Sequence, residues 1–96
     1  MLKREFENKL KKLGFKKVSR DTISVLFSND DSVEFLYRYK NVSVLSFKKT
    51  PREFMIWTKK DRSSMELISY NKVENIQKDE KDIVLDLGTM LLLFKL

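Results

Sequence analysis

The sequence contains neither cysteine nor histidine, and this double absence removes several kinds of chemistry. Disulfides cannot form, and zinc sites built from Cys and His are excluded. A Ser-His-Asp triad and a Cys-His nucleophile pair are equally impossible. Catalysis would have to rest on carboxylates, Lys, Tyr, Ser or Thr, which act only when several of them converge.

The residues that remain form no such constellation. Asp79, Glu80 and Asp82 are close in sequence, but a calcium loop needs a glycine turn and regularly spaced oxygens that end in a bidentate Glu. Gly14 and Gly88 are too isolated for a phosphate-binding loop. We therefore expect a non-enzymatic protein with no cofactor and no metal site.

Long apolar runs are also missing. The longest one extends over five residues, from Met90 to Phe94, whereas a membrane-spanning helix needs about 20. The opening residues, Met1 to Glu5, run directly into charged side chains and contain no apolar signal region. We expect a cytoplasmic protein with no integral membrane association.

The residues that are present suffice for one folded domain. The chain has 96 residues, of which 42% are hydrophobic and 11% aromatic, and this composition argues against disorder. Two domains would each be too small to bury a core, so we expect a single domain over residues 1–96.

Positive charge is concentrated in the first fifth of the chain. The formal charge is +6, and residues 1–20 hold eight basic and two acidic side chains, so the remaining residues are neutral overall. Any function of the basic character therefore belongs to the N-terminal segment.

Residues 2–13 are expected to form an amphipathic helix. Leu2, Phe6, Leu10 and Leu13 fall within an arc of about 80°, which is an apolar stripe suited to one face of a sheet. Gly14 is suited to a left-handed residue that ends the helix. The charged face has three interpretations: a solvated surface, a contact with nucleic acid, or a contact with an acidic protein or lipid surface. The candidate binding residues for nucleic acid or an acidic partner are Arg4, Lys11, Lys12, Lys16, Lys17 and Arg20.

After residue 20 the hydrophobic period changes from 3.6 to 2, which indicates strands. Segment 42–48 changes phase, and a β-bulge or burial on both faces would explain this. Segment 89–95 is apolar on both faces, which predicts a central strand with one face under the helix. The expected strands are 22–28, 33–39, 42–48, 53–59, 65–70, 82–87 and 89–95.

Short connections between these segments favour antiparallel pairing. Residues 71–81 are the exception, and a short helical turn or an irregular crossing is expected at 71–77. The expected fold is α+β, with the N-terminal amphipathic helix packed on a curled, mainly antiparallel sheet or roll of about seven strands.

The later part of the chain resembles bacterial pleckstrin-homology-like domains. The resemblance rests on Ile68, Tyr70, Val73 and Ile76, whose spacing matches an I-x-Y-x-x-I-x-x-I pattern, and on the apolar strands that follow. It covers residues 56–95 and includes a turn at 58–62. It implies a binding scaffold without shared chemistry.

Two features depart from this family. Its members usually end in a C-terminal helix, whereas this sequence ends in a strand pattern. Members that bind phosphoinositides use basic residues in the first hairpin loop, whereas the corresponding residues 29–32 are Asn-Asp-Asp-Ser. Lipid binding is therefore not implied.

These observations favour a small binding module for a protein partner, of the adaptor or inhibitor type. The alternative is nucleic-acid binding through the basic helix and residues 16–20, with an affinity that falls as salt rises. Basic residues at the turns beside strand aromatics would suit a single-stranded ligand, although such aromatics usually belong to a core. A homodimer formed by an edge strand, such as 53–59 or the strand that ends at 95–96, is a further hypothesis.

Overall fold

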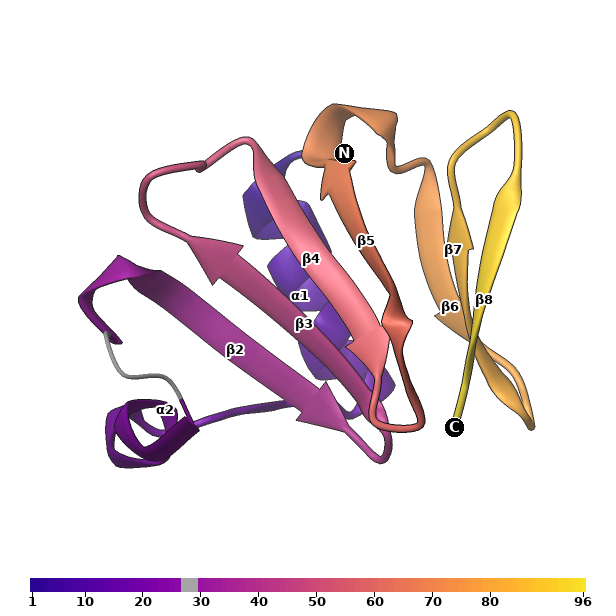
Figure 1. The fold of residues 1–96 in the computed structure, drawn as a ribbon. Coiled ribbons are helices and arrows are strands. Elements are labelled where there is room, and N and C mark those ends of the chain that lie inside the picture. The colour runs from indigo at the N-terminus through magenta and orange to yellow at the C-terminus, as the bar shows by residue number, and fades with distance from the viewer. Residues whose placement is uncertain (27–29) are drawn as a thin grey trace.

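A computed structural model describes residues 1–26 and 30–96. These residues form a small α+β domain with antiparallel strands (Figure 1). No helix in these ranges is long and apolar enough to cross a bilayer. In chain order, the elements are α1 (Lys3–Leu13), β1 (Lys16–Lys17), α2 (Arg20–Leu26), the 3-10 turn η1 (Asp30–Ser32), β2 (Val33–Tyr39), β3 (Val42–Phe47), β4 (Glu53–Thr58), β5 (Asp61–Ser69), the 3-10 turn η2 (Tyr70–Lys72), β6 (Asn75–Lys78), β7 (Asp82–Asp86) and β8 (Leu91–Lys95).

The strands of the described residues belong to two sheets, not to one sheet of seven. Five strands pair in the order β1-β2-β3-β4-β5, and three pair in the order β6-β7-β8. Every pairing is antiparallel and joins neighbours in sequence, as the short connections predict.

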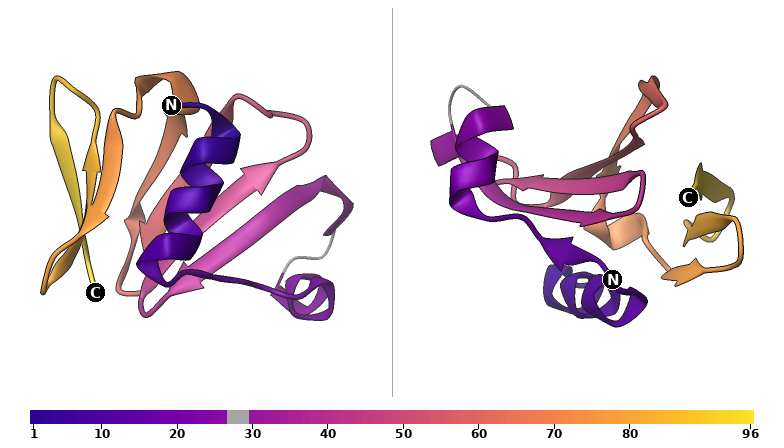
Figure 2. Two further views of the ribbon diagram at one scale, coloured as in Figure 1. Left: turned by 180° about the vertical axis from the view of Figure 1, so that it is seen from behind. Right: turned by 90° about the horizontal axis from the view of Figure 1, so that it is seen from below.

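Helix α1 lies across one face of the five-stranded sheet (Figure 2). Phe6 and Leu10 are fully buried, and the Phe6 ring centroid lies 4.5 Å from that of Phe54 on β4. Leu13 is half-buried, but Leu2 precedes the helix and is 68% exposed. The expectation that Leu2 belongs to the buried stripe is wrong, because the helix begins one residue later.

Gly14 ends α1 in the left-handed conformation, as expected. Its φ is 105°, and its N–H donates to the carbonyl of Lys11 at 3.1 Å. The N–H of Phe15 then donates to the carbonyl of Leu10 at 3.0 Å. These two bonds satisfy carbonyls that the helix end would leave without partners.

The predicted strand at 22–28 is wrong over residues 22–26, where the chain forms the helix α2; residues 27 and 28 lie outside the described residues. Ser19 caps this helix, because its Oγ accepts the N–H of Thr22 at 3.3 Å. Ile23 is buried in the smaller apolar cluster, and α2 lies on the sheet face opposite α1 (Figure 2). Its packing outweighs the alternating pattern that suggested a strand.

The apolar side chains form two clusters. The larger cluster joins α1 to both sheets through residues such as Phe6, Phe54, Ile76 and Ile83. The smaller cluster holds Ile23, Val33, Leu36, Leu45 and Trp57. The five-stranded sheet is therefore covered on both faces over its middle strands.

Burial on both faces explains the phase change in β3. Val42 and Val44 belong to the larger cluster and Leu45 to the smaller one. The register with β4 is regular from Val42 to Ser46, so no bulge interrupts this strand there. A register shift occurs instead on β2, between Val33 and Phe35.

The remaining strands differ from the expected ranges mainly at their ends. β5 begins at Asp61, earlier than the expected residue 65, and β8 begins at Leu91. Strands β1 and β6 were not expected, because two or four residues carry too little pattern. The irregular segment 71–77 contains the last two residues of η2 and then enters β6.

Two expectations about strand position are wrong. β8 is an edge strand that pairs only with β7 among the described residues, so the central position that its apolar pattern predicted is wrong, whereas the hypothesis that the strand ending at 95–96 is an edge is confirmed. Segment 53–59 was expected at an edge, but β4 lies between β3 and β5. The sequence pattern measures how apolar a strand is, and it does not show which neighbours cover it.

Candidate functional site

One end of the molecule gathers basic side chains from four parts of the chain. Here α1 ends, the β2–β3 and β4–β5 turns meet, and β6 ends (Figure 1). The N–H of Lys59 donates to the carbonyl of Asn41 at 2.9 Å, which joins the two turns. We call this region the cationic end and define it by Lys12, Lys16, Arg38, Lys40 and Lys78.

Tyr39 is the centre of the cationic end. Lys78 Nζ lies 4.8 Å from the Tyr39 ring centroid, and Lys40 Nζ lies 5.6 Å from it. Lys78 Nζ also donates to Tyr39 Oη and to the carbonyl of Leu13, both at 3.3 Å. A Cβ on Gly14 would lie 3.1 Å from the ring, which is a tight contact, and the φ of 105° also favours glycine where α1 ends against Tyr39.

Two cationic side chains oppose each other at the same end of the sheet, on the face opposite the Tyr39 ring. Lys16 on β1 is the register partner of Arg38 on β2. Like charges directly opposite each other on neighbouring strands are destabilising. Arg38 Nε donates to Ser43 Oγ at 3.4 Å, which is a neutral partner. An anion bound between Lys16 and Arg38 would remove this repulsion.

The predicted basic residues do not all remain available to a ligand. Lys11 Nζ lies 4.0 Å from Glu7. Arg4, Lys12, Lys16 and Lys17 are exposed. Of these, Lys12 and Lys16 belong to the cationic end, whereas Arg4 lies at the opposite end of α1.

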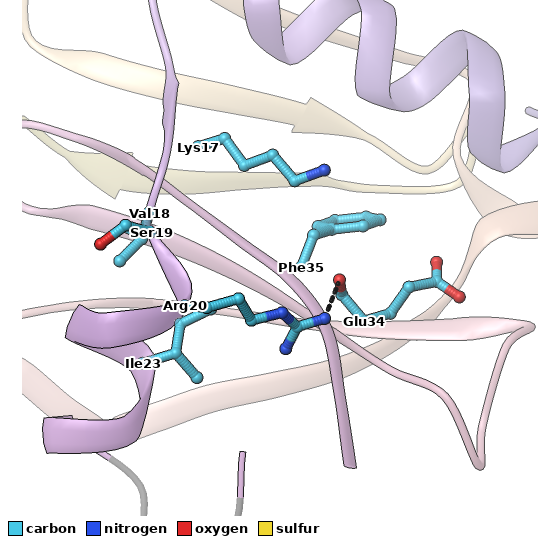
Figure 3. Close-up of a pocket in the computed structure, with 7 residues that line it drawn as sticks. All are labelled: Lys17, Val18, Ser19, Arg20, Ile23, Glu34 and Phe35. Atoms are coloured by element: carbon cyan, nitrogen blue, oxygen red, sulfur yellow. Dashed lines mark hydrogen bonds between the residues drawn. The ribbon is translucent and has the colours of Figure 1, made fainter. Parts of the chain in front are cut away.

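Arg20 supports the local structure. Its Nη1 donates to the carbonyl of Val33 at 2.8 Å, and its Nη2 donates to the carbonyl of Glu34 at 3.3 Å (Figure 3). These carbonyls belong to the part of β2 that the two-residue strand β1 does not reach. Arg20 thus stabilises an open sheet edge.

A pocket of about 370 Å³ surrounds Arg20 and is drawn in Figure 3. Its floor includes Phe35 and Ile23, and its acidic member is Glu34. The Glu34 carboxylate accepts from Lys3 Nζ at 2.8 Å. Arg20 is thus held by the backbone and Glu34 by Lys3, whereas Lys17, which also lines the pocket, is exposed.

Two buried tyrosines have shifted ionisation. Burial, together with the hydrogen bond from Tyr37 Oη to Glu7 at 2.5 Å, raises the pKa of Tyr37. Burial raises the pKa of Tyr70 to about 12, against the opposing effect of its bond to Ser46 Oγ. Tyr37 is 1% exposed, and Glu7 supplies the partner that its hydroxyl needs. Both phenols are protonated donors at neutral pH.

The acidic turn near residue 80 has a structural role. Asp79 Oδ1 accepts the N–H groups of Lys81 and Asp82 at 2.9 and 2.8 Å, which shapes the β6–β7 turn. Among the side chains that the structure describes, no three Asp or Glu residues gather as metal ligands would.

A second candidate surface lies on β8. Leu91 and Leu93 are 60% and 61% exposed, and the preceding Met90 is 54% exposed. We call Met90, Leu91 and Leu93 the leucine edge. The sequence offered the strand that ends at 95–96 as a possible edge, but it did not show which of its side chains are exposed, because the residues from Met90 to Phe94 are all apolar.

No protein-family model, curated protein or solved structure matches this chain. The resemblance to pleckstrin-homology-like domains therefore stays a prediction.

Proposed function

We propose that this chain is a small non-enzymatic binding module whose leucine edge docks onto a protein partner. The observation that carries the proposal is the exposure of Leu91 and Leu93 on an edge strand. Natural edge strands are usually protected by charges, proline or a bulge. β8 has no proline, carries its one charge at Lys95, and pairs with β7 without a register shift.

An unprotected edge suits recognition by strand addition. In that mode, main-chain hydrogen bonds give affinity, and alternate side chains give specificity. Strand β8 supplies both, with an apolar row formed by Leu91 and Leu93. A cluster of exposed apolar side chains is a common mark of a protein interaction site.

The finer architecture is part of the same proposal. We propose that α1 and the two sheets wrap the larger cluster as an open, curled roll, with β8 at one lip. The shared burial of Phe6, Phe54, Ile83 and Phe94 in that cluster supports this arrangement. Docking a partner strand on β8 would extend the three-stranded sheet without disturbing the core.

The test is capture from a cell lysate by three purified baits: the unchanged chain, Leu93→Glu and Leu67→Glu. Leu67 on β5 is the matched control, because it is 56% exposed and lies on the other sheet. We expect a protein that the unchanged chain and L67E retain and that L93E loses. Retention of the same proteins by all three baits would show that no lysate protein docks on the leucine edge, and together with a purified chain that does not self-associate it would reject this edge as the docking site.

Nucleic-acid binding at the cationic end is the second candidate function. Among the side chains that the structure describes, no carboxylate lies within salt-bridge distance of Lys12, Lys16, Lys40 or Lys78. Phosphates are suited to such a group of lysines, and an aromatic ring beside them can stack on a base.

The test compares Lys12→Glu/Lys16→Glu with the matched control Lys48→Glu/Lys49→Glu. The control makes the same charge change at the β3–β4 turn, at the other end of the sheet. We expect single-stranded DNA or RNA affinity to fall steeply with salt, and the first variant alone to lose about two units of the log–log salt slope. Equal losses in both variants, or binding that is independent of salt, would reject this function.

A further inference from the structure

About half of the backbone hydrogen-bonding groups of β8 point away from β7, its partner strand. The N–H of Leu96 donates to the carbonyl of Lys81 at 2.8 Å, and the carbonyl of Met90 accepts the N–H of Leu87 at 2.9 Å. Hydrogen-bonding groups alternate in direction along an antiparallel strand. The groups of Leu92 and Phe94 therefore also point to β7, whereas those of Leu91, Leu93 and Lys95 point away from it.

Among the described residues, no strand pairs with that outer side of β8. Each copy therefore presents three outward N–H groups and three outward C=O groups in a row. A strand that met them would complete the ladder.

We infer that the partner of the leucine edge is a second copy of this chain, with the two β8 strands paired antiparallel across a two-fold axis at Leu93. This inference rests on the proposed function, because it names the occupant of the same surface. The two three-stranded sheets would become one sheet of six strands.

The direction of the backbone groups fixes the register. In an antiparallel ladder, two residues that both point their N–H and C=O groups at the partner strand form the hydrogen-bonded pairs. Leu93 then faces Leu93 of the second copy, and Leu91 faces Lys95 of the second copy. The interface between the two β8 strands contains about six main-chain hydrogen bonds, two for each of the three residue pairs.

The side chains complement themselves in this register. Leu93 is the register partner of Val84 on β7. Across the combined sheet, the central row of side chains would therefore be Val84, Leu93, Leu93 of the second copy and Val84 of the second copy. Cross-strand apolar pairs of this kind stabilise a sheet. The apolar row lies on the axis, where the self-contact is closest.

The charges are compatible with the same register. Lys95 is paired with Asp82 of its own chain, and Leu91 is paired with Asp86. Lys95 of the second copy would then lie next to Leu91 and one strand away from Asp86. No like charges oppose each other across the joint, whereas a parallel pairing would place Lys95 against Lys95.

A two-fold contact also limits the assembly to two chains. β5 is the other long edge strand, but pairing of β8 with β5 of another copy is heterologous and would continue into an open polymer. Pairing of β8 with β8 of the second copy is isologous, and it leaves the β8 edge of neither copy open. We expect a weak dimer, because one strand joint buries less than about 1,200 Å².

The absence of cysteine in the chain makes the register directly testable. Purified Leu93→Cys is expected to form an intermolecular disulfide under mild oxidation, since Leu93 faces itself on the axis. Leu67→Cys, similarly exposed on β5, is the matched control and is expected to remain mostly unlinked. An equimolar mixture of Leu91→Cys and Lys95→Cys is expected to form mixed dimers in preference to either homodimer.

Sedimentation of the unchanged chain provides the second readout and needs no folded variant. We expect a monomer–dimer equilibrium with a dissociation constant of roughly 10–1,000 μM. Leu93→Glu is expected to weaken the dimer at least tenfold, and Leu67→Glu to leave it unchanged.

Three outcomes would overturn the inference: a chain that remains monomeric throughout that range, equal cross-linking of L93C and L67C, or a ladder of higher oligomers. If the purified chain is monomeric while L93E still loses a lysate protein that L67E retains, the second copy is wrong and the docking function stands. If neither the dimer nor the selective loss is observed, both proposals fail.

Discussion

At the scale of single residues, a hydrogen bond from a buried tyrosine helps to join α1 to the five-stranded sheet, in addition to the bond from Lys3 to Glu34. Tyr37 on β2 donates to the Glu7 carboxylate, which is 25% exposed. We expect Tyr37→Phe to lower the free energy of unfolding by about 1 kcal/mol, because a bond to a charged acceptor is lost. Tyr39→Phe is the control, since its hydroxyl accepts from the exposed Lys78, and it is expected to cost less than about 0.5 kcal/mol. Urea denaturation measures both, and equal costs would contradict this role of Tyr37.

The buried phenol of Tyr70 makes stability depend on alkaline pH. Its folded pKa is raised to about 12 from the ordinary value of 10.0. The unfolded chain therefore releases this proton first, and stability falls as pH rises above 10. We expect Tyr70 to contribute a loss of about 2 kcal/mol between pH 10 and 12, to which Tyr37 adds because its pKa is also raised. Denaturation at each pH measures the total. Tyr70→Phe is expected to decline less steeply, and an unchanged slope would show that another group is responsible.

At the scale of elements, the attachment of α2 depends on Ile23. Ile23 is 2% exposed and shares the smaller cluster with Trp57, which is the one tryptophan of the chain. We expect Ile23→Ala to cost about 2–4 kcal/mol and to shift the Trp57 fluorescence to the red as water reaches the ring. Leu26→Ala, at a position on the same helix that is 45% exposed, is the control and is expected to leave the emission unchanged. Equal emission in both variants would show that α2 does not cover Trp57.

The helices and strands differ in how well the local sequence pattern predicts them. α1 was predictable, because periodicity and Gly14 both indicate it and both describe local structure. Alternation predicted β2 and β7 for the same reason, and short apolar segments between turn residues predicted β3 and β4. The alternating pattern wrongly predicted a strand at residues 22–26, where the cap at Ser19 and the packing of Ile23 favour a helix.

Long-range placement was the part that could not be predicted. The apolar strand β8 suggested a central position, and only its pairing with β7 alone shows that Leu91 and Leu93 are exposed. The concentration of charge in residues 1–20 was correctly noted, but Lys40 and Lys78 join Lys12 only through the antiparallel turns. Both candidate surfaces are therefore products of topology.

At the scale of the whole molecule, the two candidate surfaces are built differently. The cationic end gathers lysines where α1, the turns and β6 meet, and its interactions would weaken with salt. The leucine edge is apolar, and its interactions would persist in salt. Salt dependence thus separates a ligand of one surface from a ligand of the other.

The central claim is that β8 is an open edge that a second strand completes, and residue-resolved amide exchange by NMR tests it most directly. We expect the amides of Leu92, Phe94 and Leu96 to exchange slowly at every protein concentration. Those of Leu91, Leu93 and Lys95 should exchange quickly in dilute solution and slowly in concentrated solution. Protection of Leu91, Leu93 and Lys95 in dilute solution, or fast exchange at both concentrations, would contradict the account.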